Sequence, residues 1–306
     1  MSRVLIAFVF IMLPSSALAG FPTDIVIDNL SRMQGCDLCG FEQVDVPALQ
    51  KQYYEAVAQD LMVLASPHVT SPAETTGLYG FDFGVEYTLL APRSNFQHRA
   101  NGLLATGWEA MAENGEPSTT LMAPGFSVRK GLPWSFEVEG AYRYLVGSRQ
   151  SLAMFRGKWA FQEGTPPIPD IAVGVGYGAY IGNPQLDLGA TQFDIVAGWT
   201  VPVGINSKYN GARWSPWIGY GWSIGHAKAK RNSVGLASPN LSGWFGRGSD
   251  DINNNDFQFH KMLLGMRIVA GSFQFSVSTD LVLEQGRRRP TNTGASTVTM
   301  RAGMLF

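Results

Sequence analysis

The chain has 306 residues and a formal net charge of −1, which argues against a dedicated nucleic-acid binder. Charged residues make up only 15% of it, against about 25% in an average soluble domain, whereas 45% are hydrophobic, 12% are aromatic and 35 residues are glycine. After the first residues, no stretch reaches the roughly 18 apolar residues of a membrane helix. Dispersed apolar residues with many glycines and few charges are typical of a β-barrel that faces lipid.

The first residues predict a signal peptide over 1–19. Arg3 precedes the apolar run Val4–Leu13, which is too short to span a bilayer, and Ala17-Leu18-Ala19 has the small residues of a cleavage site. We expect cleavage before Gly20. An uncleaved membrane anchor is the alternative.

Residues 20–79 are expected to form a periplasmic arm with one amphipathic helix. Asp45 is placed to cap this helix, Pro47 fits its first turn, and Pro67 ends it. One apolar stripe at spacings of three and four consists of Leu49, Tyr53, Val57, Leu61 and Leu64. Such a helix would plug a following barrel, pack under its periplasmic mouth or lie on its outside.

From Gly80 onward the period of the apolar pattern changes to two, as in strands with one apolar face. The alternation predicts strands at 81–89, 120–130, 136–144, 155–161, 171–181, 192–203, 218–225, 257–268, 273–284 and 297–306. In the eighth strand the phase shifts after Phe257 and Phe259, which a bulge near His260 would explain. We therefore predict an all-β fold, a transmembrane antiparallel up-and-down barrel of about ten strands over residues 80–306. Twelve strands is the alternative, and 103–112 is one place where a further strand could lie.

The connections between these strands alternate in length. Counted back from a periplasmic C-terminus, the periplasmic connections are 131–133, 162–169, 204–213 and 270–271. The outward ones are 91–119, 147–150, 183–190, 228–256 and 285–296. Three of the five outward connections are long, and 147–150 is the clearest exception. Long outer loops are typical of outer-membrane barrels.

The last strand has apolar residues at every second position, and the chain ends on Phe306. It resembles the C-terminal strand of bacterial outer-membrane β-barrels, whose terminal Phe is read by the barrel-assembly machinery. The resemblance implies an integral outer-membrane protein with both termini in the periplasm and with outer-membrane lipid and the assembly machinery as partners. It assigns the assembly signal to Met300, Met304 and Phe306.

A second resemblance covers two short blocks. The segment SPAETTGLYGFDFGVE at 71–86 and the segment VRKGLP at 128–133 are similar to blocks in uncharacterised outer-membrane proteins of myxobacteria and related bacteria. This resemblance implies the same barrel topology and no particular activity.

The inward positions of the predicted strands carry many charges. We expect a lumen network of Asp82, Glu86, Arg129, Glu137, Glu139, Arg143, Arg156, Lys158, Asp194, Lys261, Arg267, Asp280 and Arg301. Because an unpaired buried charge is costly, the mixed signs favour a paired and packed interior over an ion or solute path. Glycine rows at 174–178 and 219–225 thin the inner wall, where the helix, a ligand or a bulky neighbour such as Trp217 could fit.

The only two cysteines, Cys36 and Cys39, form a C-x-x-C pair. In an oxidising periplasm a structural disulfide is the expected state, with a redox or metal role as the alternatives. No His follows the pair directly, which excludes a C-x-x-C-H haem site. We predict no metal site and no cofactor.

The sequence contains no recognisable set of catalytic residues. Omptin proteases are also ten-stranded barrels, with acidic and His residues at the outer rim, and the candidates here would be His98, Glu109, Glu113, His226 and Asp250-Asp251. Their spacing matches no omptin motif, so we expect no enzymatic activity. Basic residues in two outer loops are candidates for lipopolysaccharide contacts: Lys228, Lys230, Arg231, Arg287, Arg288 and Arg289.

The sequence thus favours an outer-membrane barrel that is structural or a narrow, gated solute conduit. A rim-site enzyme acting on lipid or peptide, and a recognition or adhesion protein using loops 91–119 and 228–256, are the alternatives. Nucleic acid is not an expected partner.

Overall fold

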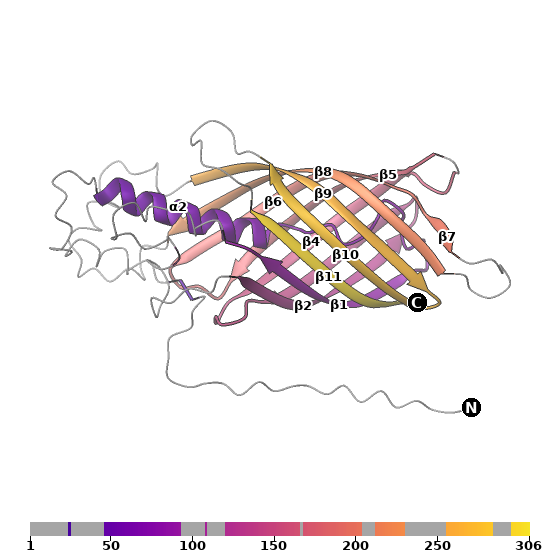
Figure 1. Ribbon diagram of the computed structural model, residues 1–306, viewed down its shortest axis with the longest axis horizontal. Coiled ribbons are helices and arrows are strands. Elements are labelled where there is room, and N and C mark those ends of the chain that lie inside the picture. Colours follow the sequence, from indigo (N-terminus) through magenta and orange to yellow (C-terminus); the bar gives the residue numbers. More distant parts are fainter. Residues whose placement is uncertain are drawn as a thin grey trace, which may run out of the picture.

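The computed structural model describes residues 24–25, 46–92, 108, 120–165, 168–203, 212–229, 255–283 and 295–306. Figure 1 shows one closed antiparallel β-barrel with a single long helix, α2, at one end and the C-terminus at the other. The predicted cleavage region, the cysteine pair and the segment 109–119 lie outside the described residues.

The helix α2 spans Val46–Ala65. The strands are β1 Phe81–Leu90, β2 Leu121–Leu132, β3 Phe136–Tyr144, β4 Ser151–Gln162, β5 Asp170–Ile181, β6 Leu186–Gly198, β7 Val201–Val203, β8 Ala212–Ala229, β9 Asn255–Ala270, β10 Phe273–Leu283 and β11 Ser296–Leu305. Within the described residues, no helix is long and apolar enough to cross a membrane.

Every neighbouring pair of strands is antiparallel, and two pairings close the ring. β1 pairs with β11, with Asp82 opposite Leu305, and β6 pairs with β8, with Leu186 opposite Ala229. The short strand β7 pairs with β8 just beyond the end of β6, so the two share one position in the wall. The eleven strands therefore make a ten-stranded barrel, which confirms the predicted fold.

The alternation of faces follows from strand geometry, which points successive side chains to opposite sides. Along β1, Phe83, Val85 and Tyr87 are exposed on the outer surface, while Asp82 and Glu86 are buried. The same alternation gives the barrel an apolar exterior around its whole circumference and directs the charged residues of the strands inward.

The predicted bulge near His260 is absent, and the outward placement of Phe257 and Phe259 was wrong. β9 keeps an unbroken register with both neighbours through His260, opposite Trp222 on β8 and Leu283 on β10. Phe257 and Phe259 are buried, on the same inward face as Lys261. The apparent phase shift arises because the lumen is apolar at this end, where it receives the helix, and charged deeper in.

The ten-stranded wall has two distinct ends. The helix end carries α2 and the connections 91–120, 145–150, 182–185, 230–254 and 284–295, and the C-terminal end carries 133–135, 163–169, 204–211 and 271–272. Phe306 lies at the C-terminal end, where its backbone exchanges two hydrogen bonds with Phe81. The helix and the C-terminus had been predicted on the same, periplasmic side. This must be corrected, because the two lie at opposite ends of the barrel (Figure 1).

Residues 66–80, which we call the inner segment, run from α2 through the lumen to β1. Pro67 cannot continue a helix, and the last helical bond joins the Ser66 N–H to the Met62 carbonyl. At the C-terminal end, Gly77 adopts a φ of +77°, and its carbonyl accepts from the Gly80 N–H, which turns the chain back into β1.

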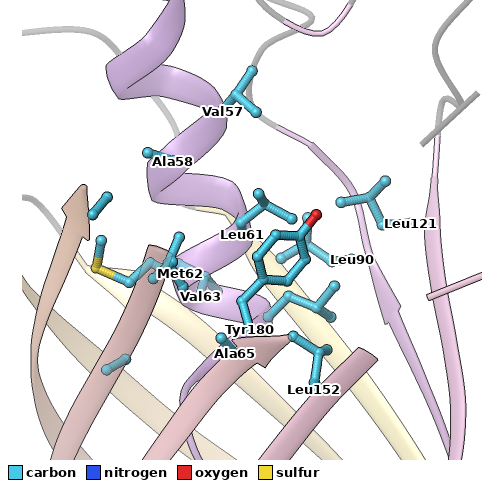
Figure 2. Close-up of a cluster of buried hydrophobic side chains, with 14 of the residues drawn as sticks. Val57, Ala58, Leu61, Met62, Val63, Ala65, Leu90, Leu121, Leu152 and Tyr180 are labelled. Atoms are coloured by element: carbon cyan, nitrogen blue, oxygen red, sulfur yellow. The ribbon is translucent and has the colours of Figure 1, made fainter. Parts of the chain in front are cut away.

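Residues 60–65 at the end of α2 are buried on all sides instead of along one stripe, because they sit inside the mouth of the barrel. Figure 2 shows Val57, Leu61 and Met62 of this helix among wall residues such as Leu152 and Tyr180. A second apolar cluster lies deeper, where Val69 and Ala73 of the inner segment belong with wall residues that include Trp217. The core of this barrel is thus formed between the wall and its own N-terminal chain.

Candidate functional site: the filled lumen

All thirteen charged residues expected in the lumen are buried there, each less than 8% exposed. They lie on inward positions of β1, β2, β3, β4, β6, β9, β10 and β11, where strand alternation alone directs them inward. The structure brings them together as ion pairs, which offsets part of the cost of removing each charge from water.

One group of these pairs joins the first strands to the last. Asp82 binds both Arg129 and Arg301, with 2.8 Å between its carboxylate and the Arg301 guanidinium. Glu86 accepts from Arg143 at 2.6 Å and lies 3.6 Å from Arg301. Arg301 therefore links two carboxylates across the β1–β11 seam that closes the barrel.

A second group lies across β3, β4 and β6. Arg156 donates two hydrogen bonds to Asp194, at 2.6 and 3.0 Å, and also lies 3.8 Å from Glu139. Lys158 pairs with Glu137 at 2.9 Å. Bidentate contacts of the Arg156 kind fix geometry as well as charge.

The inner segment is bound to this network at each level. Near the helix, Lys261 donates to the Ser66 hydroxyl, and His68 Nδ1 lies 2.8 Å from the Asp280 carboxylate. Halfway along, the Thr70 hydroxyl donates to Glu139 at 3.1 Å.

Lower in the lumen the contacts become denser. The Lys158 ammonium donates to the carbonyl oxygens of Pro72 and Glu74, at 3.1 and 2.9 Å. The Glu74 carboxylate accepts from Arg267 at 2.6 Å, and the Thr76 N–H donates to Glu137 at 2.8 Å. Wall charges thus satisfy backbone groups of a chain that has no strand neighbours of its own.

The glycine rows explain how the inner segment approaches the wall so closely. A Cβ atom added to Gly178 would lie 1.8 Å from the Ala65 carbonyl oxygen, and one on Gly176 would lie 2.8 Å from Pro67. The sequence left three possible occupants for these thin regions: the helix, a ligand or a bulky neighbour. At the glycine row on β5 the occupant is the N-terminal chain. Trp217 lies against Gly265 on the neighbouring strand β9, where an added Cβ would come within 2.2 Å of its ring.

Little space remains inside. A void bounded by Pro67, His68, Glu139 and Arg156 measures about 10 Å³, which is about one water molecule. A larger recess of about 110 Å³ lies at the C-terminal end, beside Glu74, Arg213 and Arg267. Within the described residues, no cluster of His, Cys, Asp and Glu could hold a metal ion.

Sequence reasoning missed the inner segment's own site residues, Ser66, His68, Thr70 and Glu74. They lie between a helix and the first strand and follow no periodic pattern, so they resemble an ordinary linker. The glycine rows were the one available signal, because they showed that something must fill the thin part of the wall.

The remaining candidates fall into two groups. Met300, Met304 and Phe306 are exposed on the outer surface, Lys228 is exposed near the end of β8, and His226 is exposed on the same strand. Cys36, Cys39, His98, Glu109, Glu113, Lys230, Arg231, Asp250, Asp251, Arg287, Arg288 and Arg289 lie outside the described residues.

The helix end has its own polar contacts. The Trp108 indole N–H donates to Asp60 of α2 at 2.9 Å, so the first long connection is tied to the helix. Burial raises the pKa of the Tyr54 hydroxyl on the same helix.

No protein-family model matches the sequence, and no curated protein matches it significantly. Among solved structures, the attachment invasion locus protein Ail of Yersinia pestis matches with 9% identity and a TM-score of 0.28, over 75% of this chain and 99% of that chain. Neisserial surface protein A matches with 9% identity and a TM-score of 0.24, over 74% of this chain and 95% of that chain. The outer membrane protein Omp33 of Acinetobacter baumannii matches with 9% identity and a TM-score of 0.23, over 74% of this chain and 98% of that chain. Similarities this low carry no conclusion about the role of this chain.

Proposed function

We propose that this protein is an integral outer-membrane barrel that its own N-terminal chain keeps closed. The membrane location is supported by the outer surface, where exposed large apolar side chains follow one another around the wall. Examples are Phe83, Phe126, Phe155, Ile195 and Phe275. A water-facing surface of this size and composition would aggregate, whereas a bilayer solvates it.

The observation that carries the closed state is the inner segment itself. It fills the lumen, and its polar groups are bound to buried charges of the wall at Asp280, Glu139, Lys158 and Arg267. A solute path would require the loss of these contacts together. The resting role is therefore structural, with conduction only after the inner segment has moved.

A non-enzymatic role fits the same arrangement. The void beside the buried His68, Glu139 and Arg156 measures about 10 Å³, too little for a substrate. His68 and Ser66, which have the chemistry of catalytic groups, are both less than 4% exposed and are engaged by Asp280 and Lys261.

The partners proposed for this role are membrane components. Met300, Met304 and Phe306 form an exposed apolar edge on the outer surface of the last strand, suited to the barrel-assembly machinery and then to lipid. Lys228 projects near the helix end of β8, suited to the phosphates of lipopolysaccharide.

Conductance in planar bilayers tests the closed state. The mature protein should show no steady conductance, and neither should a deletion of residues 20–60, which keeps the inner segment. Deletion of residues 20–76 removes the segment from the lumen and should produce open channels. A stable conductance from the intact protein would overturn the proposal, and silence from the longer deletion would show that the wall closes by itself.

A further inference from the structure

The two ends of the barrel differ in the length of their connections. Those at the C-terminal end are 133–135, 163–169, 204–211 and 271–272, whereas those at the helix end include 91–120, 230–254 and 284–295. Outer-membrane barrels have short periplasmic turns and longer extracellular loops. The helix end is therefore the outer one, an assignment that rests on the outer-membrane location proposed above.

The chain reaches β1 by crossing the whole lumen. Ala65 lies against Gly178 of β5, and Pro67 lies against Gly176, two residues nearer the C-terminal end. Farther along, the Thr75 hydroxyl donates to Glu163, in the connection between β4 and β5 at the C-terminal end. Residues 65–75 thus pass through the barrel from the helix end to the C-terminal end.

Residues that precede the helix are found at the helix end too. The Asp24 carboxylate accepts from the Arg149 N–H at 2.8 Å, and the Ile25 carbonyl accepts from the Asn183 side chain at 3.2 Å. Arg149 lies in the connection between β3 and β4, and Asn183 in the one between β5 and β6. Two points in the N-terminal region, residues 24–25 and α2, therefore lie at the same mouth.

We propose that the barrel carries its own N-terminal region to the cell surface, so that residues 24–25 and the start of α2 lie on the outer face of the membrane. In this topology the chain passes inward from α2 through the lumen as the inner segment and then builds the wall. The apolar contacts of α2 in the mouth and the ion pair of Glu74 with Arg267 hold the crossing chain in place. The added function is surface display of the N-terminal region, whose Cys36 and Cys39 lie outside the described residues.

The two native cysteines make a direct test possible, because they are the only ones in the chain. Intact cells producing the full-length protein would be treated with a membrane-impermeant reductant and then with a membrane-impermeant maleimide. The background control is the double variant Cys36→Ser, Cys39→Ser. Two single cysteines in that background mark the two ends, namely Lys228→Cys at the helix end and Ser272→Cys in the turn between β9 and β10.

The native protein should be labelled on intact cells, as Lys228→Cys is, and with up to two labels per chain. Ser272→Cys should be labelled only after the outer membrane is permeabilised. Labelling of the native pair only after permeabilisation, in the pattern of Ser272→Cys, would overturn the surface location. Labelling of Ser272→Cys but not of Lys228→Cys on intact cells would show that the barrel has the opposite orientation, and this would also overturn the proposal. Fractionation of the same cells separates the two proposals, because absence from the outer membrane defeats the proposed function itself.

Discussion

Glu74 of the inner segment and Arg267 of β9 form an ion pair with 2.6 Å between carboxylate and guanidinium, across 193 positions of sequence. Their side chains are 20% and 7% exposed. The pair joins the inner segment to the wall near the C-terminal end of the barrel. Substitutions at these two residues therefore test whether the inner segment occupies the lumen.

Glu74→Gln should destabilise the barrel, because it leaves the Arg267 guanidinium buried without its carboxylate. Breaking a buried pair costs about 3–5 kcal/mol, and the partial exposure of Glu74 places the expected loss toward the lower end. Unfolding of the purified protein in detergent would measure it. In a double-mutant cycle, adding Arg267→Gln should recover part of the loss, and purely additive effects would contradict the pair.

Gly178→Ala should weaken the packing of the inner segment, since the new Cβ would lie 1.8 Å from the Ala65 carbonyl oxygen. Overpacking of this kind costs about 1–3 kcal/mol. Gly221→Ala is the matched control, because it also faces the lumen but its nearest neighbour, Leu263, is 3.6 Å from the added atom. Equal thermal shifts for both variants would mean that the inner segment does not lie against β5.

Ile195→Arg should impair membrane insertion, because Ile195 is 46% exposed on the outer surface of β6. A cation near the bilayer midplane costs about 2–4 kcal/mol in such barrels. The heat-modifiable fraction in the outer membrane measures the effect, with Ile195→Leu as the control. If Ile195→Arg inserts as well as Ile195→Leu, the outer surface does not face lipid.

Deletion of Phe306 should lower the yield of assembled protein. It removes two backbone hydrogen bonds with Phe81 at the closing seam and a ring contact with 6.4 Å between centroids. Phe306→Tyr keeps the backbone bonds and an aromatic ring, so it should assemble normally. Equal yields of the deletion and the full chain would rule out an assembly role for this residue.

Cys36 and Cys39 should be joined by a disulfide in the exported protein. Mass spectrometry of non-reduced peptides would detect the link as a mass lower by two hydrogens. Two free thiols with bound zinc would instead support the metal alternative.

The strands and their faces could be predicted from the sequence because their pattern is local. In a strand the side-chain period is two, so a polar residue such as Glu137 and an apolar neighbour such as Val138 take opposite faces whatever the rest of the chain does. For the same reason, the charged residues expected in the lumen all lie there. The outward placement of Phe257 and Phe259 was wrong. Both are apolar residues on the inward face of β9, in the buried cluster that includes the end of α2.

The sequence by itself thus determined a wall of alternating strands with an apolar outside and the charged residues inside, since neighbouring residues alone decide that pattern. Only the tertiary structure decided what fills the inside and at which end the N-terminal chain lies. His68 meets Asp280 across 212 positions of sequence, and no local pattern encodes a contact of that range. The path of the inner segment is fixed by the combined shape and charge of a closed barrel, and these exist only once the strands have paired.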